Sequence, residues 1–159
     1  EALARETGES VNLAVPLGRE ALYLDQVEGT KLVRLFTAPG SRAPLHATGV
    51  GKVFLAYLGV PEGLSLTPYT PHTLTRLPDL LRELEAVRGR GYALDNEEKE
   101  LGVRCVAAPV FGASGGVVAA LSLSAPASRL SLEEAHRLAP RVVEAARRAS
   151  LRLGYTGEV

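Results

Sequence analysis

Residues 103–124 read VRCVAAPVFGASGGVVAALSLS, and this stretch decides the fold. Two apolar runs, Val103–Phe111 and Gly116–Ser124, flank a turn around residues 113–115 that contains serine and glycine. Apolar runs of strand length on both sides of such a turn predict a β-hairpin. It is the clearest hairpin in the sequence, and it indicates an antiparallel sheet.

The length of this turn decides which side chains share a face of the sheet. Ser122 and Ser124 stand two residues apart on one strand, so both hydroxyls project from the same face. A turn with an even number of residues puts Cys105 on that face, whereas an odd number puts it on the other. We predict an even turn, either residues 114–115 or residues 112–115, and therefore place Cys105 beside both serines.

Three shorter strands are predicted near the N-terminus, where apolar and polar residues alternate between tight turns. They span Val11–Leu17, Ala21–Val27 and Lys31–Phe36. Such short connections join neighbouring antiparallel strands, so the three segments are expected to form a meander.

Three helices complete the predicted fold. Thr48–Leu58 carries apolar residues at three- and four-residue spacing, and a second helix runs from Pro78 to a stop at Gly91. A capping box at Ser131 starts the last helix, which extends to about Leu153. With a short strand at Tyr92–Asp95, the order of elements predicts an α+β domain with an antiparallel sheet.

Composition narrows the class of protein. The chain has 159 residues, 46% of them hydrophobic, which suffices for one domain with a core. It contains no apolar run of membrane-spanning length and no signal peptide, and its single cysteine cannot form an internal disulfide, so we expect a cytoplasmic protein. Its 18 basic and 18 acidic residues cancel, which disfavours direct binding of nucleic acid by this domain.

The first residues indicate a piece of a longer protein. The sequence contains no methionine, and it opens with a helix-forming segment, residues 1–7, that Gly8 would close in a left-handed conformation. A chain rarely starts inside a helix, so we expect further residues upstream.

Three segments carry a resemblance to the effector-binding domain of IclR-type bacterial transcription regulators. The first is residues 11–29, which ends in LDQVEG, and the second is PLHATGVGK at residues 44–52. The third comprises GYALDNEE at 91–98, LGVRCVAAPVF at 101–111 and SLSAP at 122–126. Because these segments follow one another in the family's order, the resemblance covers almost the full chain.

The resemblance implies a GAF-like antiparallel sheet flanked by helices that binds a small organic acid, without a cofactor or an enzymatic activity. Residues 1–8 would be the end of a linker helix, and residues 9–159 the effector-binding domain. In such regulators a winged helix-turn-helix domain reads DNA. That domain would precede Glu1, and the effector domains would pair as a homodimer or homotetramer.

The resemblance places the effector pocket at seven residues, which are Gly49, Val50, Asp95, Val103, Cys105, Ser122 and Ser124. Elementary chemistry supports this set. Free amide groups at the start of the helix at 48–58, together with the helix dipole, suit a carboxylate, and two serine hydroxyls can donate to it. The acid would enter between this helix and the sheet, and its binding would bias the arrangement of two paired domains.

Each candidate also has a structural interpretation. Ser122 and Ser124 could bond neighbouring backbone, and Cys105 could be a small core residue. Gly49 could serve close packing of the helix on the sheet, and Asp95 could cap the turn that follows it.

Two residues before the helix remain ambiguous between pocket and support. We favour Thr48 as an N-cap over a ligand contact. His46 could be a pocket donor or a loop residue, and the sequence leaves both interpretations open.

Competing functions use the same residues differently. A small enzyme could use Cys105 as a nucleophile with Asp95 and one of three histidines, His46, His72 or His136. No histidine has a spacing that pairs it with the cysteine, so we expect no catalysis. A stand-alone GAF-like sensor of another regulator is the other alternative.

A metal site and a direct DNA contact are two further interpretations, and each competes with an ordinary surface role. The acidic residues within 95–100 could bind a metal, but they lack a calcium-loop pattern, and a solvated acidic turn is the favoured interpretation. An arginine stripe on the last helix could contact DNA, but a solvent-facing or subunit-facing stripe explains it equally. The stripe is Arg137, Arg141, Arg148 and Arg152, and the opposite, packing stripe is predicted as Leu138, Val142, Ala145, Ala149 and Leu153.

Overall fold

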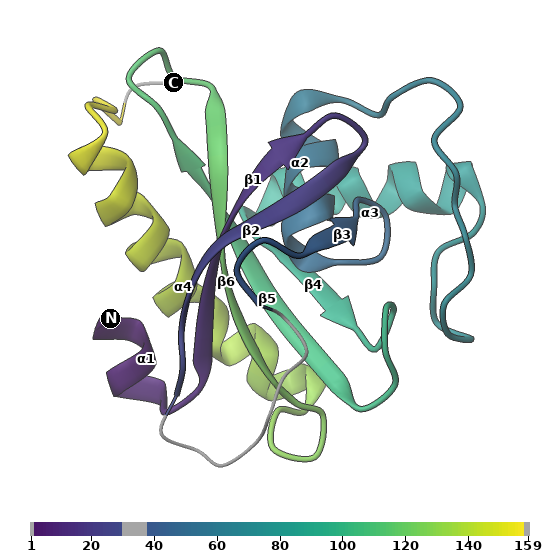
Figure 1. Cartoon of the computed structure of the whole chain (residues 1–159), viewed down its shortest axis with the longest axis horizontal. Coiled ribbons are helices and arrows are strands. Elements are labelled where there is room, and N and C mark those ends of the chain that lie inside the picture. Colours follow the sequence, from purple (N-terminus) through teal and green to yellow (C-terminus); the bar gives the residue numbers. More distant parts are fainter. Residues whose placement is uncertain (1, 30–37, 158–159) are drawn as a thin grey trace.

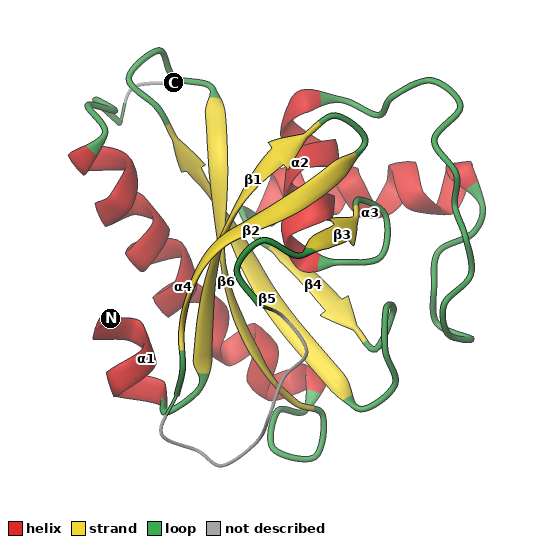
Figure 2. Ribbon diagram, viewed as in Figure 1, coloured by secondary structure: helices red, strands yellow, loops and turns green. Residues whose placement is uncertain are grey.

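A computed structural model describes residues 2–29 and 38–157 and shows one sheet between two helical layers (Figures 1 and 2). The six strands are ordered β3-β2-β1-β6-β5-β4, and all described pairs are antiparallel. The predicted α+β class with helices flanking an antiparallel sheet is confirmed. The predicted strand Lys31–Phe36 lies outside the described residues.

The described elements follow the predicted order except for β3, a short strand in a segment that was expected to be a loop. They are α1 (Ala2–Thr7), β1 (Ser10–Leu17), β2 (Glu20–Val27), β3 (Arg42–Pro44), α2 (Gly49–Leu58), α3 (Leu77–Arg90), β4 (Ala93–Asn96), β5 (Val103–Phe111), β6 (Val117–Pro126) and α4 (Leu132–Arg152). Among the described residues, no helix combines the length and apolar character that a bilayer crossing requires.

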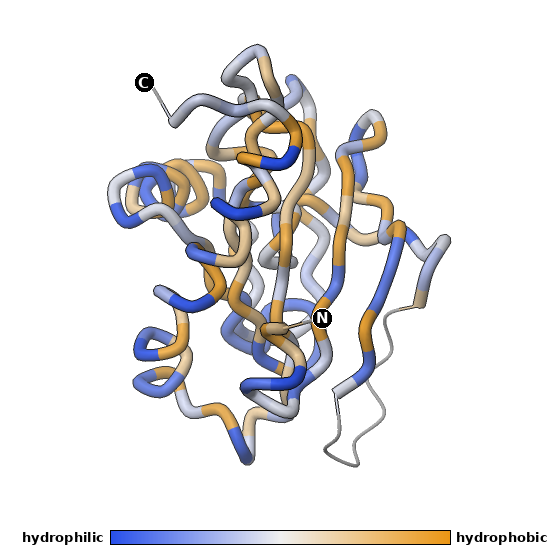
Figure 3. Tube along the Cα trace, turned by 90° about the vertical axis from the view of Figure 1, so that its left-hand side faces the viewer, coloured by the Kyte–Doolittle hydropathy of each residue, from blue (hydrophilic) through white to orange (hydrophobic). Residues whose placement is uncertain are grey.

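Side chains along the central strands point alternately to opposite faces of the sheet, so each face carries its own hydrophobic core. On β5, Val106, Ala108 and Val110 pack under α4, whereas Ala107 packs with α2 on the opposite face. Figure 3 shows hydrophobic colour concentrated along the strands in the middle of the molecule. Because both faces are covered there, the central strands read as nearly continuous apolar runs.

The turn between β5 and β6 holds five residues, 112–116, so the prediction of an even turn is wrong. A β-bulge compensates, because Val110 pairs with Ala119 and Phe111 with Val117, which leaves Val118 as an extra residue. The two irregularities cancel. Cys105 therefore pairs with Ser124 and shares its face.

The helix ends confirm the capping signals. The Thr48 hydroxyl accepts a hydrogen bond from the third amide of α2, and Pro78 lies in the first turn of α3. Gly91 ends α3 with a φ of 86°, and Ser131 forms the full capping box with Glu134 at the start of α4.

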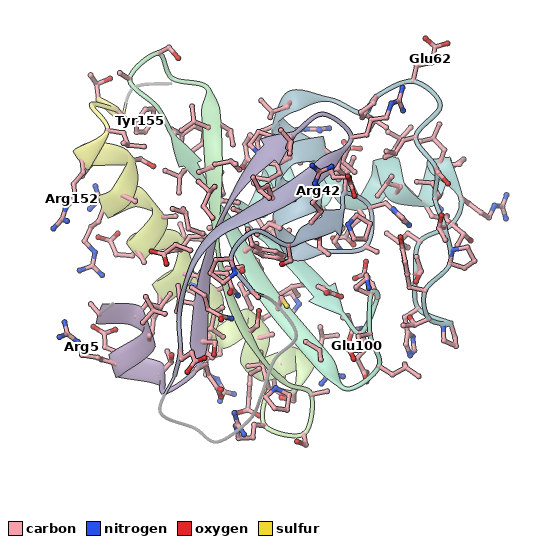
Figure 4. The ribbon with its side chains drawn as sticks, viewed as in Figure 1. Arg5, Arg42, Glu62, Glu100, Arg152 and Tyr155 are labelled. Atoms are coloured by element: carbon pink, nitrogen blue, oxygen red, sulfur yellow. The ribbon has the colours of Figure 1, made fainter. Side chains whose placement is uncertain are left out.

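The buried stripe of α4 differs from the predicted one. Val142 is buried as expected, but Leu153 is 51% exposed. The buried line consists of Ala135, Ala139, Val142, Ala146 and Ser150. Small side chains on this line let the helix approach the sheet closely, and the Ser150 hydroxyl accepts a hydrogen bond from the Phe111 amide at 2.9 Å. Figure 4 shows Arg5 and Arg152 extending outward from α1 and α4.

The start of α2 depends on a close backbone contact at Gly51. A Cβ atom there would lie 2.4 Å from the carbonyl oxygen of Leu45 and 2.5 Å from its Cα. Both are backbone atoms, which have no rotamer that relieves the clash. The segment before α2 and the first turn of the helix can therefore adopt this arrangement only with glycine at residue 51.

We predict that Gly51→Ala lowers the free energy of unfolding by about 1–3 kcal/mol, as overpacking of a close contact does. Gly89→Ala is the control, because a Cβ at Gly89 on α3 meets no atom within 4 Å. Alanine favours helix, so that variant should gain up to about 1 kcal/mol. Urea denaturation of both variants measures the difference, and equal effects would contradict the close contact.

Candidate functional site

A cavity of about 130 Å³ opens between the β4–β5–β6 side of the sheet and the segment that leads into α2. Figure 4 shows two of its charged lining residues, Arg42 and Glu100, on separate segments of the chain. The full lining is Tyr23, Ser41, Arg42, Ala43, Thr48, Asp95, Lys99, Glu100, Val103, Cys105 and Ser124.

Four of the seven residues predicted for the site line this cavity, which are Asp95, Val103, Cys105 and Ser124. Ser122 is 98% buried on the same face, one step further along β6, and does not line the cavity. The strand pairing explains the grouping, because Cys105 is paired with Asp95 on one side and with Ser124 on the other.

Gly49 and Val50 lie behind the cavity wall and are not part of its lining. A Cβ at Gly49 would lie 3.1 Å from the Cβ of Ala107 and 3.7 Å from the Cβ of Cys105. The first turn of α2 therefore rests on β5 next to the cavity. This contact supports the packing interpretation of Gly49, and it also brings the positive end of the helix close to Cys105.

The two serines belong to a network of side chains. Asn12 Nδ2 donates to Ser124 Oγ at 3.3 Å and to Ser122 Oγ at 3.5 Å, and Cys105 Sγ lies 3.1 Å from Ser124 Oγ. Among the described residues the serine hydroxyls thus bond side chains, and the backbone-bonding alternative finds no support. Asn12 was missed at the sequence level, although a buried amide in an apolar strand is a recognisable signal.

Asp95 both caps a turn and faces the cavity. Its Oδ1 accepts a hydrogen bond from the Glu98 amide at 2.8 Å, which is the predicted capping role. Burial first, and then the charge of Glu98, raise the pKa of Asp95 from 3.8 to about 7. A substantial fraction of this carboxyl is therefore protonated at neutral pH, and the protonated form can donate a hydrogen bond.

Cys105 stays a thiol in this environment. It keeps some surface open to the cavity, but its sulfur lies deep among protein atoms, so burial and then the nearby Asp95 raise its pKa. A protonated thiol is a poor nucleophile. No histidine lines the cavity: His46 Nε2 lies 2.8 Å from the Thr67 carbonyl oxygen, and His136 Nδ1 lies 2.7 Å from the Tyr92 hydroxyl.

Thr48 and His46 have supporting roles. Besides capping α2, the Thr48 hydroxyl donates to the Pro44 carbonyl at 2.7 Å, so it is committed to backbone although it lines the cavity. His46 is 98% buried and packs against Tyr69 with 5.8 Å between ring centroids. It anchors the loop and does not reach the cavity.

A buried ion pair supports the β4–β5 turn. Lys52 Nζ donates to both carboxylate oxygens of Glu98 at 2.9 and 3.0 Å, and the Lys52 side chain is 1% exposed. The interpretation of residues 95–100 as a solvated acidic turn is therefore wrong for Asp95 and Glu98, which are both buried. The described residues contain no group of three potential metal ligands.

We predict that Lys52→Ala lowers the free energy of unfolding by about 3–5 kcal/mol, because it leaves the Glu98 carboxylate buried without its partner. The matched control is Arg137→Ala, which breaks an ion pair with Glu133 whose side chains are 71% and 84% exposed. Exposed pairs contribute less than about 1 kcal/mol. Similar losses in both variants, measured by chemical denaturation, would contradict the role of the buried pair.

Sequence comparison places the chain among known regulators. The family model described as "Bacterial transcriptional regulator IclR C-terminal" matches residues 1–151. The HTH-type transcriptional regulator XynR of Escherichia coli (strain K12) is 40% identical over 159 residues, which are 96% of this chain and 63% of XynR. The chain is thus similar to the larger part of that protein but spans less than two thirds of it.

Solved structures agree with the sequence comparison. The crystal structure of Thermotoga maritima IclR superposes with a TM-score of 0.89 at 38% identity and covers 97% of this chain and 65% of that one. The inducer-binding domain of a double mutant of the PobR transcription factor from Acinetobacter, in complex with 3-hydroxybenzoic acid, gives a TM-score of 0.82 at 29% identity. This second match covers 96% of this chain and 91% of that one.

Proposed function

The chain belongs to the IclR family of bacterial transcriptional regulators as their C-terminal domain, and from this premise we propose that it senses a small carboxylate-bearing metabolite. Its relatives are named as regulators, so the domain has a regulatory and not a catalytic task. The ligand would occupy the cavity beside Asp95, Cys105 and Ser124, and its binding would modulate DNA binding by the whole protein.

The observation that carries this proposal is a cavity whose inner acidic groups, Asp95 and Cys105, have raised pKa values. The Ser124 hydroxyl, the Cys105 thiol and the protonated Asp95 carboxyl all line the cavity, and each is able to donate a hydrogen bond to a ligand that displaces a present contact. The first amides of α2, at Gly49 and Val50, precede the one that Thr48 caps and add the positive end of the helix. We infer that the ligand carboxylate lies between these donors, with Ser122 and Val103 supporting them.

The size of the cavity supports a small acid as the ligand. Its volume of about 130 Å³ is close to that of an engineered cavity of about 150 Å³ that holds benzene. The related PobR domain, with its bound 3-hydroxybenzoic acid, supports a small organic acid as the ligand class. Acids of roughly six heavy atoms fit without rearrangement by this comparison.

The rest of the protein is inferred from the family. We propose that residues 1–8 end a linker helix, that residues 9–159 form the effector-binding domain, and that DNA is contacted only through an N-terminal domain. Paired effector domains, as a homodimer or homotetramer in the cytoplasm, would convert ligand binding into a change in the spacing of the DNA-reading domains.

We predict that the double variant Ser122→Ala/Ser124→Ala loses at least about tenfold in affinity for a bound acid. It removes the Ser124 hydroxyl, which lines the cavity, and the Ser122 hydroxyl, which bonds Asn12 beside it. Isothermal titration calorimetry follows a thermal-shift screen of small acids that identifies a binder. The control is Ser128→Ala in the loop after β6, outside the cavity. Unchanged affinity in a folded double variant would refute the pocket.

We also predict that ligand affinity falls as the pH rises above about 7. The ligand acid stays ionised from pH 6 to 9, whereas Asp95 loses its proton and then repels it. Glu98, Lys52, Cys105 and Tyr23 face Asp95, and Lys52 remains paired with Glu98. The decline should approach tenfold per pH unit well above 7.

Asp95→Asn is the matched variant for this prediction, because the amide keeps a donor and cannot ionise. Its affinity should be independent of pH from 6 to 9 in calorimetric titrations. Since the folded pKa of Asp95 lies above its unfolded value, wild-type stability should also fall from about pH 4 to above pH 7 relative to this variant. An identical pH profile of affinity for both proteins would contradict the role of Asp95.

A further inference from the structure

Tyr23 is a polar residue of the cavity whose hydroxyl has no hydrogen-bond partner within residues 2–29 and 38–157. Its side chain is 93% buried and lines the cavity, yet no described residue forms a hydrogen bond with its phenol oxygen. Two backbone hydrogen bonds to the segment before β3 fix its backbone. The Tyr23 amide donates to the Ser41 carbonyl at 3.0 Å, and its carbonyl accepts from the Gly40 amide at 2.7 Å. The strand thus holds the ring in place.

The other inward polar groups are already engaged. Ser124 is hydrogen-bonded to Asn12 and Cys105, and Asp95 accepts from the Glu98 amide. The Thr48 hydroxyl donates to the Pro44 carbonyl and accepts from the Gly51 amide. No fully buried side-chain nitrogen or oxygen of the described residues lacks a partner, so the Tyr23 oxygen is open to the cavity. A ligand that fills the cavity without bonding this oxygen would bury it unpaired, which costs free energy. A tyrosine held with its hydroxyl towards a cavity therefore indicates a position where a ligand atom supplies the missing bond.

The chemistry of the phenol makes it a donor. Burial first, and then the acidic neighbours Cys105 and Asp95, raise the pKa of Tyr23, so its hydroxyl keeps its proton at any physiological pH. The ligand atom that meets it must therefore accept a hydrogen bond. An oxygen of a hydroxyl, keto or second carboxylate group satisfies this requirement, whereas a methyl or methylene group does not.

The sheet order places Tyr23 on a different wall from the donors proposed for the carboxylate. Tyr23 lies on β2, and Ser124 lies on β6, with β1 between them. The two strands are therefore about 10 Å apart, at roughly 4.8 Å per strand. The pairing of Tyr23 with Ala14, and of Ala14 with Ala120, also offsets Tyr23 from Ser124 by four residues along β6. An acid that spans the cavity from β6 towards β2 carries its carboxylate at one end and a second polar atom at the other.

We propose that Tyr23 is a specificity-determining residue that donates a hydrogen bond to a second oxygen of the ligand, so that the domain selects small hydroxy or oxo acids over plain acids of equal length. This inference rests on the proposed function. An acid without the second oxygen leaves the buried phenol unpaired, and sites built around such a bond reject the analogue that lacks it.

The test compares matched acids by calorimetry. The probes are propionate, lactate and pyruvate, their two- and four-carbon analogues, and benzoate against 3-hydroxybenzoate. Wild-type protein should bind the oxygen-bearing member of at least one series about tenfold or more tightly than its plain acid. Tyr23→Phe should weaken binding of that member about tenfold and leave the plain acid unchanged, which brings the ratio close to one.

Two controls separate selectivity from folding. Tyr92→Phe removes a hydroxyl that bonds His136 outside the cavity, and it should leave the ratio of affinities unchanged. Tyr23→Phe should keep the melting temperature of the unliganded protein within about 2 °C of wild type, because its hydroxyl stabilises nothing there.

The outcomes distinguish this inference from the proposed function. If Tyr23→Phe weakens plain and oxygen-bearing acids equally, or changes neither, Tyr23 does not determine specificity, while the sensor function stands. If the variant melts well below wild type without ligand, the hydroxyl has a structural role and the inference is wrong. If wild-type protein binds no acid of any series, the proposed function fails, and the inference fails with it.

Discussion

The buried ion pair between Lys52 and Glu98 is the interaction on which the cavity depends. It joins α2 to the turn after β4, two segments that are 46 residues apart in the sequence. Glu98 also donates its amide to Asp95 and accepts from the Asn96 amide at 3.0 Å. One residue thus positions the inward carboxyl and ties its strand to the helix. A hydrophobic pair of similar volume could fill the space, but it would not fix the direction of Asp95.

In the proposed function, side chains that are acidic in water would bind an anion. Asp95, Cys105 and Tyr23 share one poorly solvated space, and burial is the main cause that raises the pKa of each. Asp95 raises the pKa of Cys105 and of Tyr23 further, because two negative charges there would repel. Their neutral forms are hydrogen-bond donors. The cations Arg42 and Lys99 line the cavity together with the acidic Glu100, and the buried Lys52 is paired with Glu98. The lining therefore offers directed donors and little net charge, which favours selection by shape and by the position of oxygen atoms.

Local patterns in the sequence predicted the elements well, since Thr48, Gly91 and Ser131 each act within a few residues of their own position. The face of Cys105 was also predicted correctly, although an odd turn and a bulge replaced the expected even turn. Contacts between distant segments were not predictable. Tyr23 reaches the cavity because β2 neighbours β1, and β1 neighbours β6, an order that hydrophobic periodicity does not encode. The burial of the acidic turn likewise required Lys52, whose place in the chain gives no local signal.

Strand β1 offers a physical route from the cavity to the N-terminal helix. Asn12 points to the cavity face and bonds Ser122 and Ser124, whereas its neighbour Val11 points to the other face and belongs to the core that contains Leu3 of α1. If the proposed ligand competes for the serine hydroxyls, it would shift the position of Asn12, and the backbone of β1 would carry that shift to Val11. Packed cores respond by repacking between discrete arrangements, so a small shift of Val11 would be enough to change how α1 packs on the sheet. In this view the sheet itself, with a polar face towards the ligand and an apolar face towards the helix, is the coupling element between ligand and linker.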